Sequence, residues 1–573
     1  MAKLLKPGTV ENLKTRSNVR RFEVAVLTAF LFSILACSRS ITISSGVQAT
    51  QWAAQLTAVV PQEDIHQGSA ANSDPQPTIG NSTPPLESID SIPTASPTSG
   101  DAFPTASNLP ALNPTSKPQL PTEQASPTLI TPNTIPTSKS TQMPVIYYTQ
   151  AGDTLHAIAV RFNVKPDEIT SPVAIPSEGL FSPGQLLLIP NKLGETGDSG
   201  KLLPDSEIVF SPAAIDFDVK TFVKNAGGYL ATYQEWLTTG WKSGAEVIQQ
   251  VAIENSVNPR LLLALIEYQG HWVYGQPTNL AETDYPLGYK DYSNHGLYRQ
   301  LSWAVSQLSV GYYGWRAGLV TELDFPQGKV RIAPDLNAGT VALQYLFSRL
   351  YLTRREWGGA LYAPDSIPTL YERMFGNPWL RAQTVEPLYP PNLTQPTLEL
   401  PFPQGQTWSM TGGPHSAWGP DGALAAIDFA PSSTEHGCVT SDKWVTASAA
   451  GLVVRSENGV VILDLDGDGH EQTGWVLLYL HIATDGRVPA GAWVAKDDKI
   501  GHPSCEGGVA TGTHVHIARK FNGEWILADG PVPFVLSGWQ VHAGEQPYKG
   551  TLTKDDQVVI ADIYGTYQTR ITR

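Results

Sequence analysis

Residues 510–520 read ATGTHVHIARK, and this stretch decides how the C-terminal part of the chain is interpreted. The alternation of His514 and His516 with apolar residues is typical of a strand, in which residues i and i+2 point to the same face. We therefore expect the two imidazoles to lie side by side and to be directed at one point. Such an arrangement suits a metal ligand beside a catalytic group, although two surface histidines would fit the same pattern.

The surrounding sequence predicts a mainly β domain with an antiparallel sheet over residues 400–573, including a C-terminal extension. Short apolar runs are divided there by Gly, Pro and Asp, and residues 444–482 read as strand, turn, strand, loop, strand. Eight of the twelve histidines lie from His415 onward. Any metal chemistry is therefore expected in this part of the chain.

The histidines and carboxylates of this region include a set that could support hydrolysis. A catalytic zinc needs about three His, Asp or Glu ligands and one open position, together with groups that move a proton and stabilise an oxyanion. Taken alone, each candidate is weak, because a buried His or Asp is more often satisfied by ordinary hydrogen bonds. The candidates are His415 in GGPHSAW, Asp428 in AAIDFAP, His481 in LLYLHIA, and the pair His514 and His516.

Together these motifs resemble the lysostaphin-type, or β-lytic, zinc metallopeptidases over roughly residues 400–535. The resemblance implies that His415, Asp428 and His516 bind Zn²⁺ and that His481 and His514 are catalytic. The first His and the Asp are usually four residues apart in that family, whereas here the interval is 428 − 415 = 13. The longer interval and the GGPHS…IDF motif resemble the LasA-like staphylolytic branch of that family. The implied substrate is the peptide cross-link of peptidoglycan.

The N-terminus predicts export. Residues 1–37 have a basic segment, an apolar run too short for an ordinary membrane span, and the ending ILAC, which resembles the lipobox of bacterial lipoproteins. Lipidation of Cys37 would anchor the protein to a membrane; a short uncleaved anchor or plain cleavage remains an alternative. Residues 38–143 are rich in Pro, Ser and Thr and are expected to form an extended linker.

Two cysteines remain after Cys37, namely Cys438 and Cys505. Outside the cytosol such a pair is expected to form a disulfide, with two free thiols as the alternative.

Residues 144–193 predict a small βααβ module. The GDTL…IA…F opening and the SPGQLLLIP close resemble a LysM module, which implies binding to glycans that contain N-acetylglucosamine. The segment TSPVAIPSEG in the middle of the module departs from the usual Asn-containing sequence of that family.

Residues 205–395 predict a mainly α domain, with two helices separated at Asn258-Pro259. The segment NPRLLLALIEYQG resembles the opening of lysozyme-like lytic transglycosylases. Gln269 occupies the position of their catalytic glutamate, and a neutral amide cannot act as general acid. We therefore expect a degenerate domain; cleavage through Glu267 and a purely structural role are the alternatives.

The length of the chain agrees with several domains. The chain has 573 residues and a net charge of -15 without basic runs, which argues against nucleic acid as a partner. The sequence thus predicts an extracytoplasmic peptidoglycan endopeptidase whose partners are peptide stems and glycan. A non-catalytic peptidoglycan-binding or hydrolase-regulating protein is the alternative.

Overall fold

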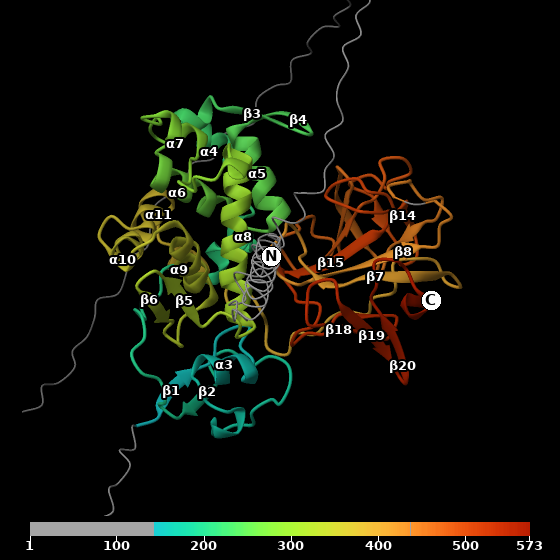
Figure 1. The fold of residues 1–573 in the computed structure, drawn as a ribbon, viewed down its shortest axis with the longest axis horizontal. Helices are drawn as coiled ribbons and strands as arrows, with labels where there is room; N and C mark the ends of the chain where they lie inside the picture. The colour runs from blue at the N-terminus through green and yellow to red at the C-terminus, as the bar shows by residue number, and fades with distance from the viewer. Residues whose placement is uncertain (1–142, 436) are drawn as a thin grey trace, which may run out of the picture. The chain divides into compact units, whose positions relative to one another are not determined.

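The computed structural model describes residues 143–435 and 437–573 (Figure 1). The predicted signal peptide, the lipobox at Cys37 and almost all of the linker lie outside these residues. Among the described residues, no helix is both long enough and apolar enough to span a membrane.

The N-terminal module has the predicted order of strand, helix, short helix and strand. β1 (Val145–Tyr148) pairs antiparallel with β2 (Leu186–Ile189), and α3 (Leu155–Arg161) and the 3₁₀ turn η2 (Pro166–Glu168) lie between them in the chain. Thr154 caps α3 by accepting a hydrogen bond from the backbone of Ala157. This element order agrees with the expected βααβ arrangement, while the LysM resemblance itself stays a prediction.

The middle region is mainly α, as expected. In its helix α6 (Pro259–Gly270), all residues from Leu261 to Ile266 are buried and belong to the helical core. The break predicted before α6 is present, because Ser256 ends α5 in a left-handed conformation and Pro259 starts α6. The longer helices are α4 (Val219–Ala226), α5 (Gly244–Asn255), α6 (Pro259–Gly270), α8 (Leu297–Arg316), α9 (Ala338–Leu350), α10 (Arg354–Tyr362) and α11 (Ile367–Phe375).

Two short helices and two hairpins complete the helical domain. They are α7 (Leu280–Asp284), α12 (Pro378–Ala382), the hairpin of β3 (Gln234–Leu237) and β4 (Gly240–Ser243), and the hairpin of β5 (Glu322–Phe325) and β6 (Gly328–Arg331).

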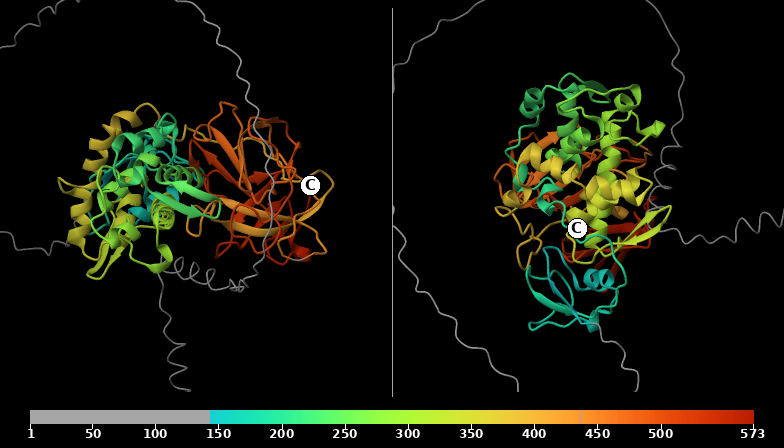
Figure 2. Two further views of the ribbon diagram at one scale, coloured as in Figure 1. Left: turned by 90° about the horizontal axis from the view of Figure 1, so that it is seen from above. Right: turned by 90° about the vertical axis from the view of Figure 1, so that its left-hand side faces the viewer.

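The C-terminal region confirms the predicted antiparallel β domain. A nine-stranded sheet has the order β13-β10-β11-β12-β15-β8-β7-β21, with β16 paired to β15, and is drawn in orange and red in Figure 2. Its strands are β7 (Thr407–His415), β8 (Ala426–Pro431), β10 (Gly451–Glu457), β11 (Val460–Asp464), β12 (Trp475–Leu480), β13 (Trp493–Val494), β15 (Val515–Phe521), β16 (Glu524–Trp525) and β21 (Arg570–Thr572).

Smaller sheets pack beside this one. A four-stranded sheet consists of β17 (Val535–Leu536), β18 (Trp539–Ala543), β19 (Gly550–Lys554) and β20 (Gln557–Ile560), and β9 (Val445–Thr446) pairs with β14 (Lys499–Gly501).

The two faces of the nine-stranded sheet have different partners. On β15, Val515 and Ile517 belong to an apolar core that also contains residues of β18 and β19. Ala518 points to the other face and belongs to the same core as α6, α8 and α9. His516 lies two residues before Ala518 in an uninterrupted ladder, so it shares the face that the helical domain covers.

Candidate metal centre

Three of the predicted residues converge at one end of this covered face. His516 on β15 is directly opposite Asp428 on β8, and a bulge in β7 brings His415 to the same place. Asp428 Oδ1 lies 3.3 Å from both His415 Nε2 and His516 Nδ1, and these two nitrogens are 3.0 Å apart. All three side chains are buried.

Backbone carbonyls fix which nitrogen each imidazole presents. His415 Nδ1 lies 2.8 Å from the carbonyl oxygen of Gly413, and His516 Nε2 lies 3.1 Å from that of Ala417. A carbonyl oxygen only accepts hydrogen bonds, so both of these nitrogens carry a proton. The nitrogens that face Asp428 therefore present lone pairs, as in metal-binding histidines oriented by a second hydrogen bond.

This geometry fits a cation. Within the residues that the structure describes, Asp428 Oδ1 is buried and has no hydrogen bond. Burial would raise the pKa of Asp428, but His415 and His514 hold it well below its usual value. Burial would lower the pKa of His415, but the Asp428 carboxylate raises it. The cluster thus favours a positive charge between its ligand atoms, and two His and one Asp are a suitable donor set for zinc.

The two histidines predicted to be catalytic lie beside the cluster. The ring centroids of His481 and His514 are 4.4 Å apart, and His514 Nε2 is 3.7 Å from Asp428 Oδ1. Each donates its Nδ1 proton to a carbonyl, that of Glu506 for His481 and that of Gly512 for His514. Both Nε2 atoms are therefore left free to exchange a proton.

The environment keeps His481 neutral. Burial and the neighbouring histidines lower its pKa to about 3, so that its Nε2 is a lone-pair acceptor at neutral pH. His481 directly follows β12 and has a left-handed backbone, with φ of 66°. This conformation is unusual for a residue other than Gly. It interrupts the alternation of side chains between the two faces of the sheet at His481.

The H-x-H pair differs in one respect from the predicted strand. β15 begins at Val515, and His514 makes only an isolated bridge to Ser504 just before it. His514 thus lies at the end of the ladder, where it is 16% exposed, whereas His516 is 7% exposed within the ladder.

Several residues that shape the site were missed by sequence reasoning. The carbonyl oxygens of Gly413, Ala417, Glu506 and Gly512 have no side-chain signature. The ring of Tyr548 stacks on His415 at 4.2 Å between centroids, and it comes from the loop between β18 and β19. Only the repeated Gly of the GGPH motif could have been noticed, because a Cβ at Gly412 would lie 2.3 Å from Asp428 Oδ2.

The predicted disulfide between Cys438 and Cys505 is present. Cys505 directly precedes Glu506, whose carbonyl orients His481 and whose carboxylate accepts hydrogen bonds from Thr484. The bridge therefore ties the loop that holds His481 to the segment around Cys438.

Glu267 and Gln269 of the helical domain, and an acidic turn at residues 464–469 with the sequence DLDGDG, have local structural explanations. Glu267 caps its own helix end by accepting hydrogen bonds from the backbone of Val273 and Tyr274, and Gln269 contacts Tyr351. Asp464 gathers with Asp466 and Asp468 in the DLDGDG turn, and its oxygens accept backbone hydrogen bonds within that turn.

Comparison with known proteins identifies relatives of this chain. A family model described as LasA, N-terminal domain, matches residues 201–390. The chain is 27% identical over 361 residues to Protease LasA of Pseudomonas aeruginosa, covering 58% of this chain and 79% of the relative. It is 28% identical over 153 residues to Beta-lytic metalloendopeptidase of Lysobacter enzymogenes, covering 26% of this chain and 82% of that relative.

Among solved structures, the M23 metalloprotease pseudoalterin from the deep sea is similar to part of the chain. The identity is 21%, the TM-score is 0.24, and the match covers 29% of this chain and 96% of that one.

The relatives and the His-Asp-His cluster together support the assignment of this chain as a metalloendopeptidase. The match to the LasA N-terminal domain falls on the helical region for which lysozyme-like ancestry was expected, and that resemblance stays a prediction.

Proposed function

We propose that this protein is a peptidoglycan hydrolase that cleaves peptide cross-links with a zinc ion held by His415, Asp428 and His516. The observation that carries this proposal is the convergence of two imidazole lone pairs and one unpaired carboxylate oxygen within 3.3 Å of one another. Three protein ligands leave a coordination position for water or substrate, as catalytic zinc requires.

Bound zinc would supply Lewis acidity and a water molecule of lowered pKa. The protein's own residues then handle the proton and the developing charge. His514 and His481 present their Nε2 atoms beside the cluster, so one accepts the proton of the attacking water at its Nε2 lone pair, and the other stabilises the oxyanion in the form that carries a proton on Nε2 as well as on Nδ1. Because the Nδ1 atoms of both donate to carbonyls, the tautomers are set before substrate arrives.

The remaining parts of the chain fit targeting to a cell wall. The LysM-like module at 144–193 would bind N-acetylglucosamine-containing glycan and raise the local concentration of cross-links. The predicted export signal and lipid anchor at Cys37 would place the enzyme in the extracytoplasmic envelope, with the linker 38–143 spanning part of the wall.

The test uses the full chain, loaded with zinc and mixed with peptidoglycan. New free amines report peptide cleavage, and new reducing ends report glycan cleavage. We expect amines that disappear with a chelator and with Asp428→Asn, and that persist in Glu267→Gln.

A non-catalytic wall-binding protein is the competing function. Binding to peptidoglycan without release of amines, at full zinc occupancy, would establish that function instead. Reducing ends that vanish in Glu267→Gln would show that the helical domain still cleaves glycan.

A further inference from the structure

The loop that joins the two ligands His415 and Asp428 is shared with the helical domain. This β7–β8 loop, residues 416–425, contributes Ala417, Ala423 and Ala425 to the same buried apolar core as α6, α8 and α9, and its Trp418 packs against that core. A Cβ at Gly419 would lie 3.9 Å from Asn255 Oδ1. The loop therefore packs into the core that the sheet shares with the helical domain, and at Gly419 it lies beside α5 and α8.

The same loop carries the acceptor that orients His516. The Nε2 proton of His516 is donated to the carbonyl of Ala417, which leaves Nδ1 as the ligand atom. Ala417 is 1% exposed, and its own backbone N–H donates to the carbonyl of Ala423 across the loop. A displacement of the loop would remove the hydrogen bond that selects the metal-binding tautomer of His516.

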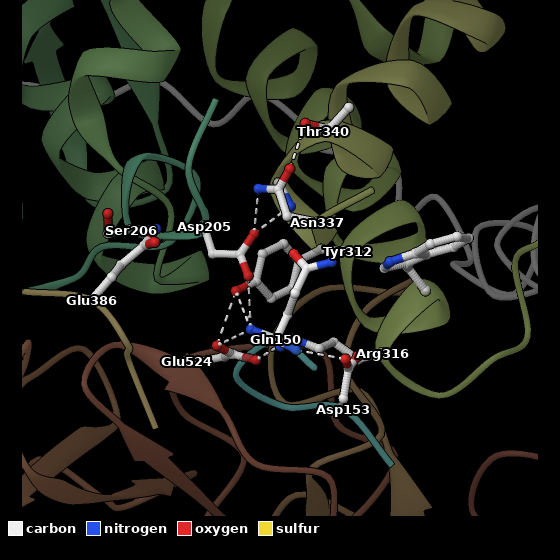
Figure 3. Close-up of polar contacts among 12 residues, drawn as sticks. Gln150, Asp153, Asp205, Ser206, Tyr312, Arg316, Asn337, Thr340, Glu386 and Glu524 are labelled. Atoms are coloured by element: carbon white, nitrogen blue, oxygen red, sulfur yellow. Dashed lines mark hydrogen bonds and ion pairs between the residues drawn. The ribbon is translucent and has the colours of Figure 1, made fainter. Parts of the chain in front are cut away.

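Buried charges join the helical domain to the sheet (Figure 3). Arg316 at the end of α8 contacts Asp205 at 3.0 Å and Glu524 on β16 at 3.1 Å, and Tyr312 donates a hydrogen bond to Glu524. Glu524 is 1% exposed. A buried ion pair that loses one partner is strongly unfavourable, so the network favours the observed alignment of α8 with β16.

Hydrogen bonds near this network reinforce the alignment. The backbone N–H of Trp525 donates to the hydroxyl of Tyr313 on α8, and Ser256 at the end of α5 donates to the carbonyl of Gly523. The turn before β16 leaves no room for a side chain, since a Cβ at Gly523 would lie 2.1 Å from the carbonyl oxygen of Phe210.

We propose that the helical domain is a positioning element of the metal centre, which acts by holding the β7–β8 loop and, through the Ala417 carbonyl, the ligand nitrogen of His516. Trp418, which packs against the core shared by the sheet and the helical domain, is the positioning residue of the loop. This inference rests on the proposed function, because it concerns zinc bound at the cluster. The domain then serves the chemistry directly, in addition to any part in targeting.

The test measures zinc affinity of the full chain by competition with a chromophoric chelator. Trp418→Ala removes the packing from the loop side, and the triple variant Asp205→Asn/Arg316→Met/Glu524→Gln loosens the interface while removing the buried cation together with both of its carboxylate partners. We expect each to weaken zinc binding about tenfold. The matched control is Trp493→Ala, which removes a Trp that is 62% exposed on the edge strand β13 and should leave zinc affinity unchanged.

A second measurement distinguishes positioning from general destabilisation. NMR of the zinc-free chain with isotope-labelled histidine reports the tautomer of His516, which we expect to be Nε2–H in the parent and mixed in Trp418→Ala. Circular dichroism confirms that the variants are folded. Parental zinc affinity and a single Nε2–H tautomer in both folded variants would overturn the inference. A parent chain that binds no zinc would instead refute the proposed function, while the tautomer comparison would still test the positioning.

Discussion

His415 Nε2 and His516 Nδ1 face each other at 3.0 Å, and each ring is held from behind by a backbone carbonyl. Two lone pairs at this distance repel unless a cation lies between or beside them. The carboxylate of Asp428 adds a third donor at 3.3 Å from both nitrogens. The two imidazoles and the carboxylate are therefore arranged to bind a cation.

Asp428→Asn is expected to remove most of the zinc affinity, by at least about 100-fold. The amide has the shape of the carboxylate but lacks its charge. Mutation of a residue that only hydrogen-bonds to a metal ligand typically lowers metal affinity 10- to 100-fold, and the loss of a ligand itself should lower it further. Chelator competition measures the change. Asp555→Asn, in the turn between β19 and β20, serves as the control, and equal affinities for both variants would contradict the ligand assignment.

His481→Gln and His514→Gln are expected to separate metal binding from catalysis. Each should lower kcat about 100- to 10,000-fold, because proton transfer or oxyanion stabilisation is lost, while zinc affinity stays nearly unchanged. Release of amines from peptidoglycan gives kcat, and chelator competition gives affinity. A variant that loses zinc instead would show that its histidine is a ligand.

Gly412→Ala is expected to damage the centre although it adds one methyl group. The new Cβ would lie 2.3 Å from Asp428 Oδ2, so the carboxylate must move from its position opposite His516. Zinc affinity should fall, with little change in helix or sheet content by circular dichroism. Gly358→Ala on α10 is the matched control, since no atom lies within 4 Å of its Cβ position.

Glu386→Gln is expected to change the pH dependence of stability. Burial and the neighbouring Asp205 raise the pKa of Glu386 to about 7, while the backbone N–H of Ser206 and Arg316 oppose the rise. The folded state thus binds the proton more tightly than the unfolded state, and the free energy of unfolding falls as the pH rises from about 4.5 to 7.

The amide cannot ionise, so Glu386→Gln should abolish this decline and raise the free energy of unfolding at pH 8 by about 3 kcal/mol. Denaturant titrations at pH 4.5 and pH 8 measure both values. The exposed Glu545→Gln is the control. A variant whose stability follows the parent's pH profile would show that the pKa of Glu386 is the same in the folded and unfolded states.

Cys438→Ser/Cys505→Ser is expected to lower the free energy of unfolding by about 3–4 kcal/mol, because the bridge closes a long loop. It should also lower kcat, since Glu506 next to Cys505 orients His481. Denaturant titration and amine release measure the two effects. Cys37→Ser, outside the bridge, should change neither quantity in the purified chain.

The sequence by itself was sufficient to select five side chains that the fold brings close together and to predict the β class of their domain. The period of two in THVHI and the motifs around His415, Asp428 and His481 involve residues that are close together in the sequence. Such local patterns can be recognised without knowing the fold. The order of elements in the N-terminal module and the break before Pro259 were predictable for the same reason, since caps and proline act on neighbouring residues.

Tertiary structure decided how these side chains work. The bulge in β7 brings His415 to Asp428, and carbonyl oxygens of Gly413, Ala417, Glu506 and Gly512 choose the tautomers. A carbonyl is common to every residue, so its role depends only on where the fold places it. The Arg316–Glu524 contact joins residues 208 positions apart. No local pattern encodes it, because burial of both charges exists only after the helical domain and the sheet have packed together.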